Sequence, residues 1–180
     1  MRGVETMKKS ALLKAALGLM LVSSMALAGC GGSFGDGAKS DTVKVGVAIP
    51  LTGASAEDGN AIKNGVTLAA KLANAEGGLK GKKVEVVFED DKGDPSEAAT
   101  VANKLAQDKS IAAVVGHFNS SCTLAGAPIY NQAGVVEISP GSSAAAVTKA
   151  GPFTFRVITT DAVQGNSLMQ WAVKDLVYKN

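Results

Sequence analysis

The sequence predicts an α/β fold, a parallel sheet with helices on both faces. From residue 42 onward, short apolar runs rich in β-branched residues alternate with helix-length segments. The apolar runs end in polar stretches of Gly, Ser, Pro or acidic residues, as strands do at the edge of a sheet. Strands that alternate with helices are joined by crossover connections, which place helices on both sides of a parallel sheet.

The first predicted strand and the first predicted helix follow one another. Residues 42–49 form a buried-strand pattern that Pro50 closes, and a loop is expected over residues 51–59. In residues 60–76 the apolar side chains recur on one helical face, and a Gly-Gly pair then ends the helix. That face consists of Ile62, Val66, Ala69, Ala70 and Ala73.

A second strand and a second helix come next. Residues 83–89 alternate apolar and polar side chains, which predicts a strand with one buried face. Asp94 then supplies a helix N-cap, Pro95 suits the first helical position, and Glu97 stands three residues after the cap. We therefore predict a helix that runs to Gln107.

Three acidic residues, Glu89, Asp90 and Asp91, stand at the end of the second strand. Such a cluster suggests either a metal site or a solvated strand end. Transition-metal sites usually add His or Cys ligands, and none cluster here. We therefore interpret the cluster as solvated and predict no metal site.

The next two strands and the helix between them carry the strongest signal for a site. Residues 111–116 and 135–139 are β-branched apolar runs, and residues 120–134 have the length of a helix. Parallel strands end at the same edge of a sheet, which is where ligands bind in open α/β sheets. A fifth strand is predicted over residues 153–158 and a further helix over residues 164–178.

Polar residues at this edge favour an α-amino acid as the ligand. Ser120 and Ser121 stand at the predicted start of a helix, where free N–H groups and the helix dipole attract a carboxylate. After the neighbouring strand, Gly141 and Ser143 offer main-chain carbonyls and a hydroxyl that suit an ammonium group. The alternative is that Ser120 is only a helix N-cap and residues 141–143 form only a turn.

His117 raises the alternative of an enzyme, because a histidine near Ser120 or Cys122 resembles a base beside its nucleophile. A single histidine at the end of an apolar strand is more often a structural residue, and no acid at a recognisable spacing completes a triad. The stretch after the first strand also lacks the Gly-x-Gly-x-x-Gly pattern of dinucleotide sites. We therefore predict a non-enzymatic protein without a cofactor.

Residues 1–29 have the pattern of a lipoprotein signal peptide. Two lysines precede an apolar run that is too short for a membrane anchor and that ends in Leu-Ala-Gly-Cys30. Cleavage before Cys30 would leave its thiol for acylation and anchor the mature chain to a membrane. The alternative is an ordinary signal peptide with a coincidental cysteine. Residues 30–41 are then the lipidated cysteine and a flexible tether.

The charge balance argues against nucleic acid as a partner. Without residues 1–29, which hold four of the 18 basic and one of the 16 acidic residues, the net charge is near −1. Cys122 is then the only cysteine besides Cys30, so no intrachain disulfide is expected.

Short motifs along residues 43–171 are weak one by one but specific in their order and spacing. They include Pro50-Leu-Thr-Gly53, Asp90-Asp91 before Asp94-Pro95, Val115-Gly-His117, Ser120-Ser121, Ile138-Ser-Pro140, and Arg156 with Gln164-Gly165. This combination resembles the leucine/isoleucine/valine-binding proteins of ABC importers, a branch of the type I periplasmic binding proteins. The resemblance implies two lobes that close on a ligand at a hinge. It also implies that Ser120 holds the ligand carboxylate while Gly141 and Ser143 hold its ammonium group.

Family chains cross into the second lobe at the position of Thr160 and Asp161, which are therefore expected hinge residues. The resemblance then implies that residues 42–160 form an incomplete first lobe. Residues 161–180 would begin the second lobe in a truncated chain.

The implied function is that of a lipid-anchored protein in the periplasm or on the outer face of the bacterial cell membrane. It would capture leucine, isoleucine or valine and deliver it to the permease of an ABC importer. A sensor or regulatory module for amino acids or amides, built on the same fold, is the alternative. Two departures from the family pattern are Asp58, where close relatives carry an aromatic residue in the side-chain pocket, and Gly93, where they carry a cysteine. Asp58 bears on specificity for leucine-like side chains. Gly93 removes one cysteine of a disulfide bridge that the resemblance would otherwise imply.

Overall fold

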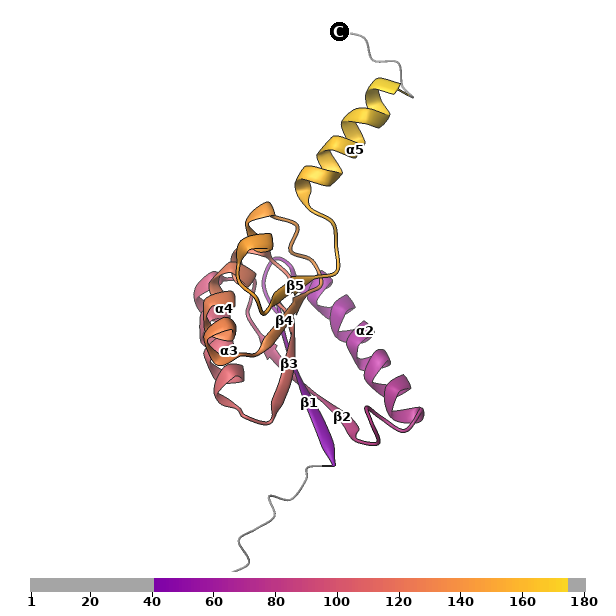
Figure 1. Ribbon diagram of the computed structural model, residues 1–180, viewed down its shortest axis with the longest axis vertical. Helices are drawn as coiled ribbons and strands as arrows, with labels where there is room; N and C mark the ends of the chain where they lie inside the picture. The colour runs from indigo at the N-terminus through magenta and orange to yellow at the C-terminus, as the bar shows by residue number, and fades with distance from the viewer. Residues whose placement is uncertain (1–40, 175–180) are drawn as a thin grey trace, which may run out of the picture. The chain divides into compact units, whose positions relative to one another are not determined.

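The computed structural model describes residues 41–174. They form one parallel sheet of five strands in the order β2-β1-β3-β4-β5 (Figure 1). The strands are β1 (Thr42–Ile49), β2 (Lys83–Asp90), β3 (Ile111–Gly116), β4 (Val136–Ser139) and β5 (Thr154–Arg156). After β1 the chain forms β2 on one side and then β3 on the other. The strand order therefore reverses between β1 and β3, the point at which such sheets bind ligands.

Helices cover both faces of the sheet, which confirms the predicted architecture (Figure 1). Helix α2 (Ala56–Ala75) packs on β1 and β2 from one side. Helices α3 (Pro95–Gln107) and α4 (Ser120–Ala133) pack against each other and cover the other side. A short 3-10 helix, η1 (Ala145–Lys149), precedes β5, and α5 (Asp161–Lys174) follows it.

The best-packed core lies between the sheet and the pair α3 and α4. Leu105 from α3 is 2% exposed and Tyr130 from α4 is 0% exposed. Full burial of a side chain such as Leu105 contributes about 1.5–3 kcal/mol, so this layer is a main source of stability. The core comprises Ala48, Val101, Ala102, Leu105, Ala106, Ile111, Val114 and Tyr130.

The start of α3 confirms the predicted capping pattern. Asp94 Oδ1 accepts hydrogen bonds from the backbone N–H groups of Ser96 at 2.8 Å and Glu97 at 3.1 Å. Pro95 is the first residue of the helix. The Glu97 carboxylate pairs with the Lys92 ammonium group at 3.0 Å, so it supports the same turn in a way that the cap motif does not predict.

The start of α2 was predicted wrongly. The helix begins at Ala56, so the predicted loop over residues 51–59 contains its first turn. Gly59 explains the early start, because a Cβ atom there would collide with the carbonyl oxygen of Pro50. The missing side chain lets this turn pack directly on the end of β1.

Three features after β4 also differ from the prediction. β5 has three residues rather than the six over residues 153–158, and η1 was not predicted. Helix α5 begins at Asp161 rather than at residue 164, because the Thr160 hydroxyl accepts the Val163 N–H at 3.2 Å and so caps the first turn. The signal peptide, Cys30, most of the tether and the predicted end of the last helix lie outside the described residues.

The sheet face under α2 is less completely covered. A groove of about 260 Å³ lies between α2 and the first three strands, and its lining is apolar. Leu68 and Leu72 on α2 are more than half exposed, and α5 buries none of its residues. Within residues 41–174, no helix is both long and apolar enough to cross a membrane.

Candidate functional site

The loops after β3 and β4 meet at the carboxyl edge of the sheet. Ser120 is the first residue of α4, and Asn119 occupies the cap position, so Ser120 is not the N-cap. Instead, the Ser120 hydroxyl oxygen accepts the backbone N–H of Ala144 at 3.2 Å. Its hydroxyl proton remains available to donate to a carboxylate, beside the free N–H groups of the first helical turn.

The loop after β4 presents two groups for an ammonium ion. The Gly141 carbonyl and the Ser143 hydroxyl make no hydrogen bond with any other described residue. The Ser143 carbonyl is already used, because it accepts the backbone N–H of Asp161 at 3.0 Å. Ser121 lies next to Ser120 on α4 and is exposed. The structure thus brings Ser120 and the loop of Gly141 and Ser143 together at one edge.

Phe118 is a residue of this edge that sequence reasoning missed. A Cβ atom built on Gly141 would collide with the Phe118 ring, so the ring lies directly against the Gly141 backbone. Phe118 is partly exposed and comes two residues before Ser120. A large apolar residue between a buried strand and a polar helix start was the available signal.

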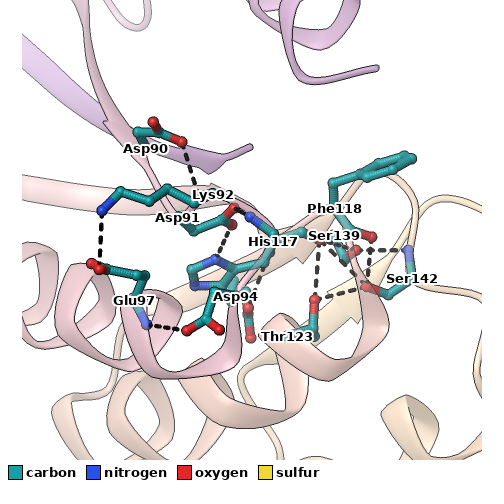
Figure 2. Close-up of polar contacts among 12 residues, drawn as sticks. Asp90, Asp91, Lys92, Asp94, Glu97, His117, Phe118, Thr123, Ser139 and Ser142 are labelled. Carbon is teal, nitrogen blue, oxygen red and sulfur yellow. Dashed lines mark hydrogen bonds and ion pairs between the residues drawn. The ribbon is translucent and has the colours of Figure 1, made fainter. Parts of the chain in front are cut away.

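Behind the loops, the His117 main-chain carbonyl gathers three hydroxyl groups (Figure 2). It accepts hydrogen bonds from Ser139 Oγ at 2.6 Å, Thr123 Oγ1 at 3.1 Å and Ser142 Oγ at 3.4 Å. Ser142 also donates to the Phe118 carbonyl at 3.1 Å and is fully buried. Ser142 therefore fixes the loop rather than facing a ligand.

The His117 side chain is buried and paired with an acid that the sequence did not reveal. Its Nδ1 atom lies 2.6 Å from Asp91 Oδ2 (Figure 2). Its Nε2 atom lies 3.4 Å from the Tyr130 hydroxyl oxygen. Both side chains of this pair are 0% exposed, so the interpretation of Asp91 as solvated was wrong. A pair sealed from solvent cannot reach a substrate, which supports the structural interpretation of His117.

The carboxylate of Asp90 holds the loop after β1. It accepts the Thr52 hydroxyl at 2.6 Å and the Leu51 backbone N–H at 2.8 Å. Partial burial raises the pKa of Asp90, but the hydrogen bonds from Thr52, Lys92 and Leu51 together outweigh it and hold that pKa below its usual value. No group of three or more metal-ligating side chains occurs among residues 41–174.

Glu137 is a second buried carboxyl group near the loops. It accepts the His117 backbone N–H at 3.3 Å and the Thr154 hydroxyl at 3.3 Å. Loss of hydration on burial raises the pKa of Glu137 to about 8, although these two hydrogen bonds act in the opposite direction. Burial likewise raises the pKa of Cys122 to about 11, so its thiol is protonated and poorly nucleophilic at neutral pH.

Asp58 and the expected hinge residues occupy definite places. Asp58 is exposed in the first turn of α2, which Gly59 holds against the end of β1. Thr160 caps α5, and Asp161 bonds to Ser143 through its backbone. The start of α5 thus contacts the loop of Gly141 and Ser143.

Comparison with known proteins assigns the chain to a family. Residues 42–180 match the family model described as "Periplasmic binding protein", which is more than half of the chain. The chain belongs to the periplasmic binding protein family. This confirms the resemblance that the sequence motifs indicate.

Two similar curated relatives are named for amino acids. The Leu/Ile/Val-binding protein homolog 1 of Brucella abortus is 40% identical over 140 residues, which are 77% of this chain and 37% of the relative. An amino acid binding protein of Pseudomonas aeruginosa is 45% identical over 125 residues, or 68% and 33% of the two chains. The chain thus spans about a third of their length.

Solved structures of periplasmic binding proteins confirm the fold. LivJ of Streptococcus pneumoniae, a branched-chain amino acid transporter substrate-binding protein in complex with isoleucine, has a TM-score of 0.71 and 34% identity, over 76% of this chain and 39% of LivJ. A solute binding protein of an ABC transporter from Rhodopseudomonas palustris, in complex with 3,4-dihydroxybenzoic acid, has a TM-score of 0.69 and 31% identity, over 75% and 37%. The described residues therefore form a lobe of the type I periplasmic binding protein fold.

Proposed function

We propose that this chain binds a branched-chain amino acid and delivers it to the permease of an ABC importer, without catalysing a reaction. One observation carries the proposal: groups suited to both charged ends of an amino acid stand on two loops that are hydrogen-bonded to each other. The Ser120 hydroxyl and the start of α4 suit the carboxylate. The Gly141 carbonyl and the Ser143 hydroxyl suit the ammonium group, as carbonyl and hydroxyl oxygens accept its N–H donors.

The proposed organisation follows from the same reasoning. Residues 42–160 belong to the first of two lobes, the chain crosses at Thr160 and Asp161, and residues 161–180 begin the second lobe. Residues 1–29 are a signal peptide, and an acylated Cys30 holds the protein at the outer face of the cell membrane or in the periplasm. The names of the Brucella and Pseudomonas relatives support an amino acid as the cargo.

A carboxylic acid without an ammonium group is the second candidate ligand. The Rhodopseudomonas relative was solved with 3,4-dihydroxybenzoic acid, so a protein of similar fold accepts an aromatic acid. The Ser120 edge would hold that carboxylate equally well. The Gly141 carbonyl and the Ser143 hydroxyl favour the amino acid, because both can accept hydrogen bonds from an ammonium group.

The test is calorimetric titration of the two-lobed form of the protein with leucine, isoleucine, valine and 3,4-dihydroxybenzoate. We expect at least one of the three amino acids to bind with a dissociation constant of about 1 μM or lower. Leucinamide, which keeps the ammonium group and loses the carboxylate, is the matched control and should bind far more weakly. Binding of dihydroxybenzoate alone would establish the second candidate, and binding of none of the four would refute the proposal.

A further inference from the structure

Arg156 reaches from the end of β5 to the loop after β4. Its Nη1 atom donates hydrogen bonds to the Ala144 carbonyl at 2.8 Å and to the Ser142 carbonyl at 3.2 Å. Its Nη2 atom donates to the hydroxyl of Thr148 in η1. One guanidinium group therefore ties together the residues on both sides of Ser143.

These contacts decide which loop groups remain for a ligand. Arg156 occupies the carbonyls before and after Ser143, and the Asp161 N–H occupies the carbonyl of Ser143 itself. The Gly141 carbonyl and the Ser143 hydroxyl are among the acceptors of this loop that make no hydrogen bond with another described residue. The Arg156 side chain thus largely determines which acceptors of this loop are already hydrogen-bonded and which remain free.

The chemistry of Arg156 suits this task better than that of a lysine. A guanidinium group is planar and presents its donors in a fixed fork, whereas an ammonium group is a point charge on a flexible stem. Within residues 41–174, Arg156 forms no ion pair with a carboxylate, and its hydrogen-bond partners are two carbonyls and a hydroxyl. The guanidinium group of Arg156 therefore orients neutral acceptors, namely two carbonyls and a hydroxyl.

We propose that Arg156 is a positioning residue for the ammonium end of the ligand site. It acts through the loop and does not touch the ligand: it turns the carbonyls of Ser142 and Ala144 away and so presents the Gly141 carbonyl and the Ser143 hydroxyl. This role rests on the proposed function. It predicts that damage to Arg156 weakens the recognition of the ammonium group and spares the recognition of the carboxylate.

The experiment compares L-leucine with 4-methylpentanoate, which has the same carbon skeleton and carboxylate but no amino group. Both are titrated into the two-lobed protein and into its Arg156→Lys variant, which keeps the charge and loses the fork. We expect leucine affinity to fall about tenfold or more, the usual cost of a lost charge-assisted hydrogen bond, and 4-methylpentanoate affinity to change less than about twofold. An equal loss for both ligands, or no loss for leucine, would overturn the inference.

Two further variants keep the test decisive. Lys149→Gln removes an exposed cation from η1, close in sequence to Thr148, and should leave both affinities unchanged. Thr148→Val removes only the partner of Arg156 Nη2 and should weaken leucine binding about two- to fourfold, again without affecting 4-methylpentanoate. If Arg156→Lys does not fold, the Thr148→Val result decides the matter. A wild-type protein that binds no amino acid would refute the proposed function itself, before any variant is made.

Discussion

The two faces of the sheet differ in what they bury. On the side of α3 and α4, the structure encloses an apolar core together with the hydrogen-bonded pair of His117 and Asp91, and Tyr130 contributes to both. On the side of α2, an apolar groove stays open and Leu72 is 56% exposed. Polar side chains are tolerated inside a protein where hydrogen bonds satisfy them. This difference indicates that the ligand loops after β3 and β4 are held in place by residues on the side of α3 and α4, which we call the closed face; the side of α2 is the open face.

One connection between that face and the ligand edge is the main-chain carbonyl group of His117. The imidazole of His117 is fixed by the closed face, and the carbonyl of the same residue holds the hydroxyls of Ser139 and Ser142 in the loop after β4. Substitutions in the closed face should therefore alter ligand binding, whereas substitutions in the open face should leave it unchanged.

The largest expected effect is in the core of the closed face. Leu105→Ala should lower the free energy of unfolding by about 2–5 kcal/mol, because Leu105 is 2% exposed and its loss leaves a cavity. Leu72→Ala on the open face is the matched control and should change the free energy of unfolding by less than about 0.5 kcal/mol. Urea unfolding followed by circular dichroism measures both. Similar losses would show that the α2 face is covered as well.

The next effect depends on pH and concerns Glu137. Its pKa rises from 4.5 in the unfolded chain to about 8 in the folded protein, so between these values the folded state binds more protons. The stability from this group is complete below about pH 4.5 and is lost as the pH rises through 8. Glu137→Gln should therefore become more stable relative to the wild type as the pH rises from 5 to 8.5, by about 2–4 kcal/mol.

Urea titrations of both proteins at several pH values test this prediction. The difference between variant and wild type cancels the titration of the groups that the substitution leaves unchanged. Glu85→Gln, an exposed carboxyl on β2, should show no such trend. A difference that stays constant with pH would mean that the Glu137 carboxyl is ionised throughout.

A smaller effect is expected at the ligand edge. In the two-lobed protein, Ser120→Ala should weaken amino-acid binding by about 1–3 kcal/mol, because the carboxylate loses a charge-assisted hydrogen bond and the loop loses the acceptor for the Ala144 N–H. Ser121→Ala, at the exposed neighbouring position, should cost less. Calorimetric titration of the wild type and the two variants measures the affinities. Equal affinities would mean that Ser120 supports the loop but does not bind the ligand.

The smallest effect on the fold is expected at Cys30, which lies outside the described residues. Cys30→Ser should release the protein from the membrane fraction while its unfolding free energy changes by less than about 0.5 kcal/mol. Mass spectrometry of the wild-type membrane fraction should show an acylated N-terminal Cys30. A wild-type chain that is soluble and unmodified after cleavage would contradict the lipoprotein prediction.

Local patterns in the sequence were enough to predict the architecture, since apolar periodicity and the Asp94 cap act over a few residues. The pairing of His117 with Asp91 was not predictable, because the two residues are 26 positions apart and meet only through the register of parallel strands. The start of α2 was missed because Gly59 indicates a loop when its contact with Pro50 is unknown. Likewise, nothing near Arg156 in the sequence points to carbonyl groups 12 and 14 residues earlier.

The contact between Phe118 and Gly141 sets a rule for how this site can vary among related proteins. The ring fills the space that a side chain at position 141 would need, so the two positions share one fixed volume. An alanine at position 141 therefore requires either that the Phe118 ring move aside or that position 118 carry a smaller residue. Paired exchange of the two residues is thus the route that leaves the backbone of this edge in place.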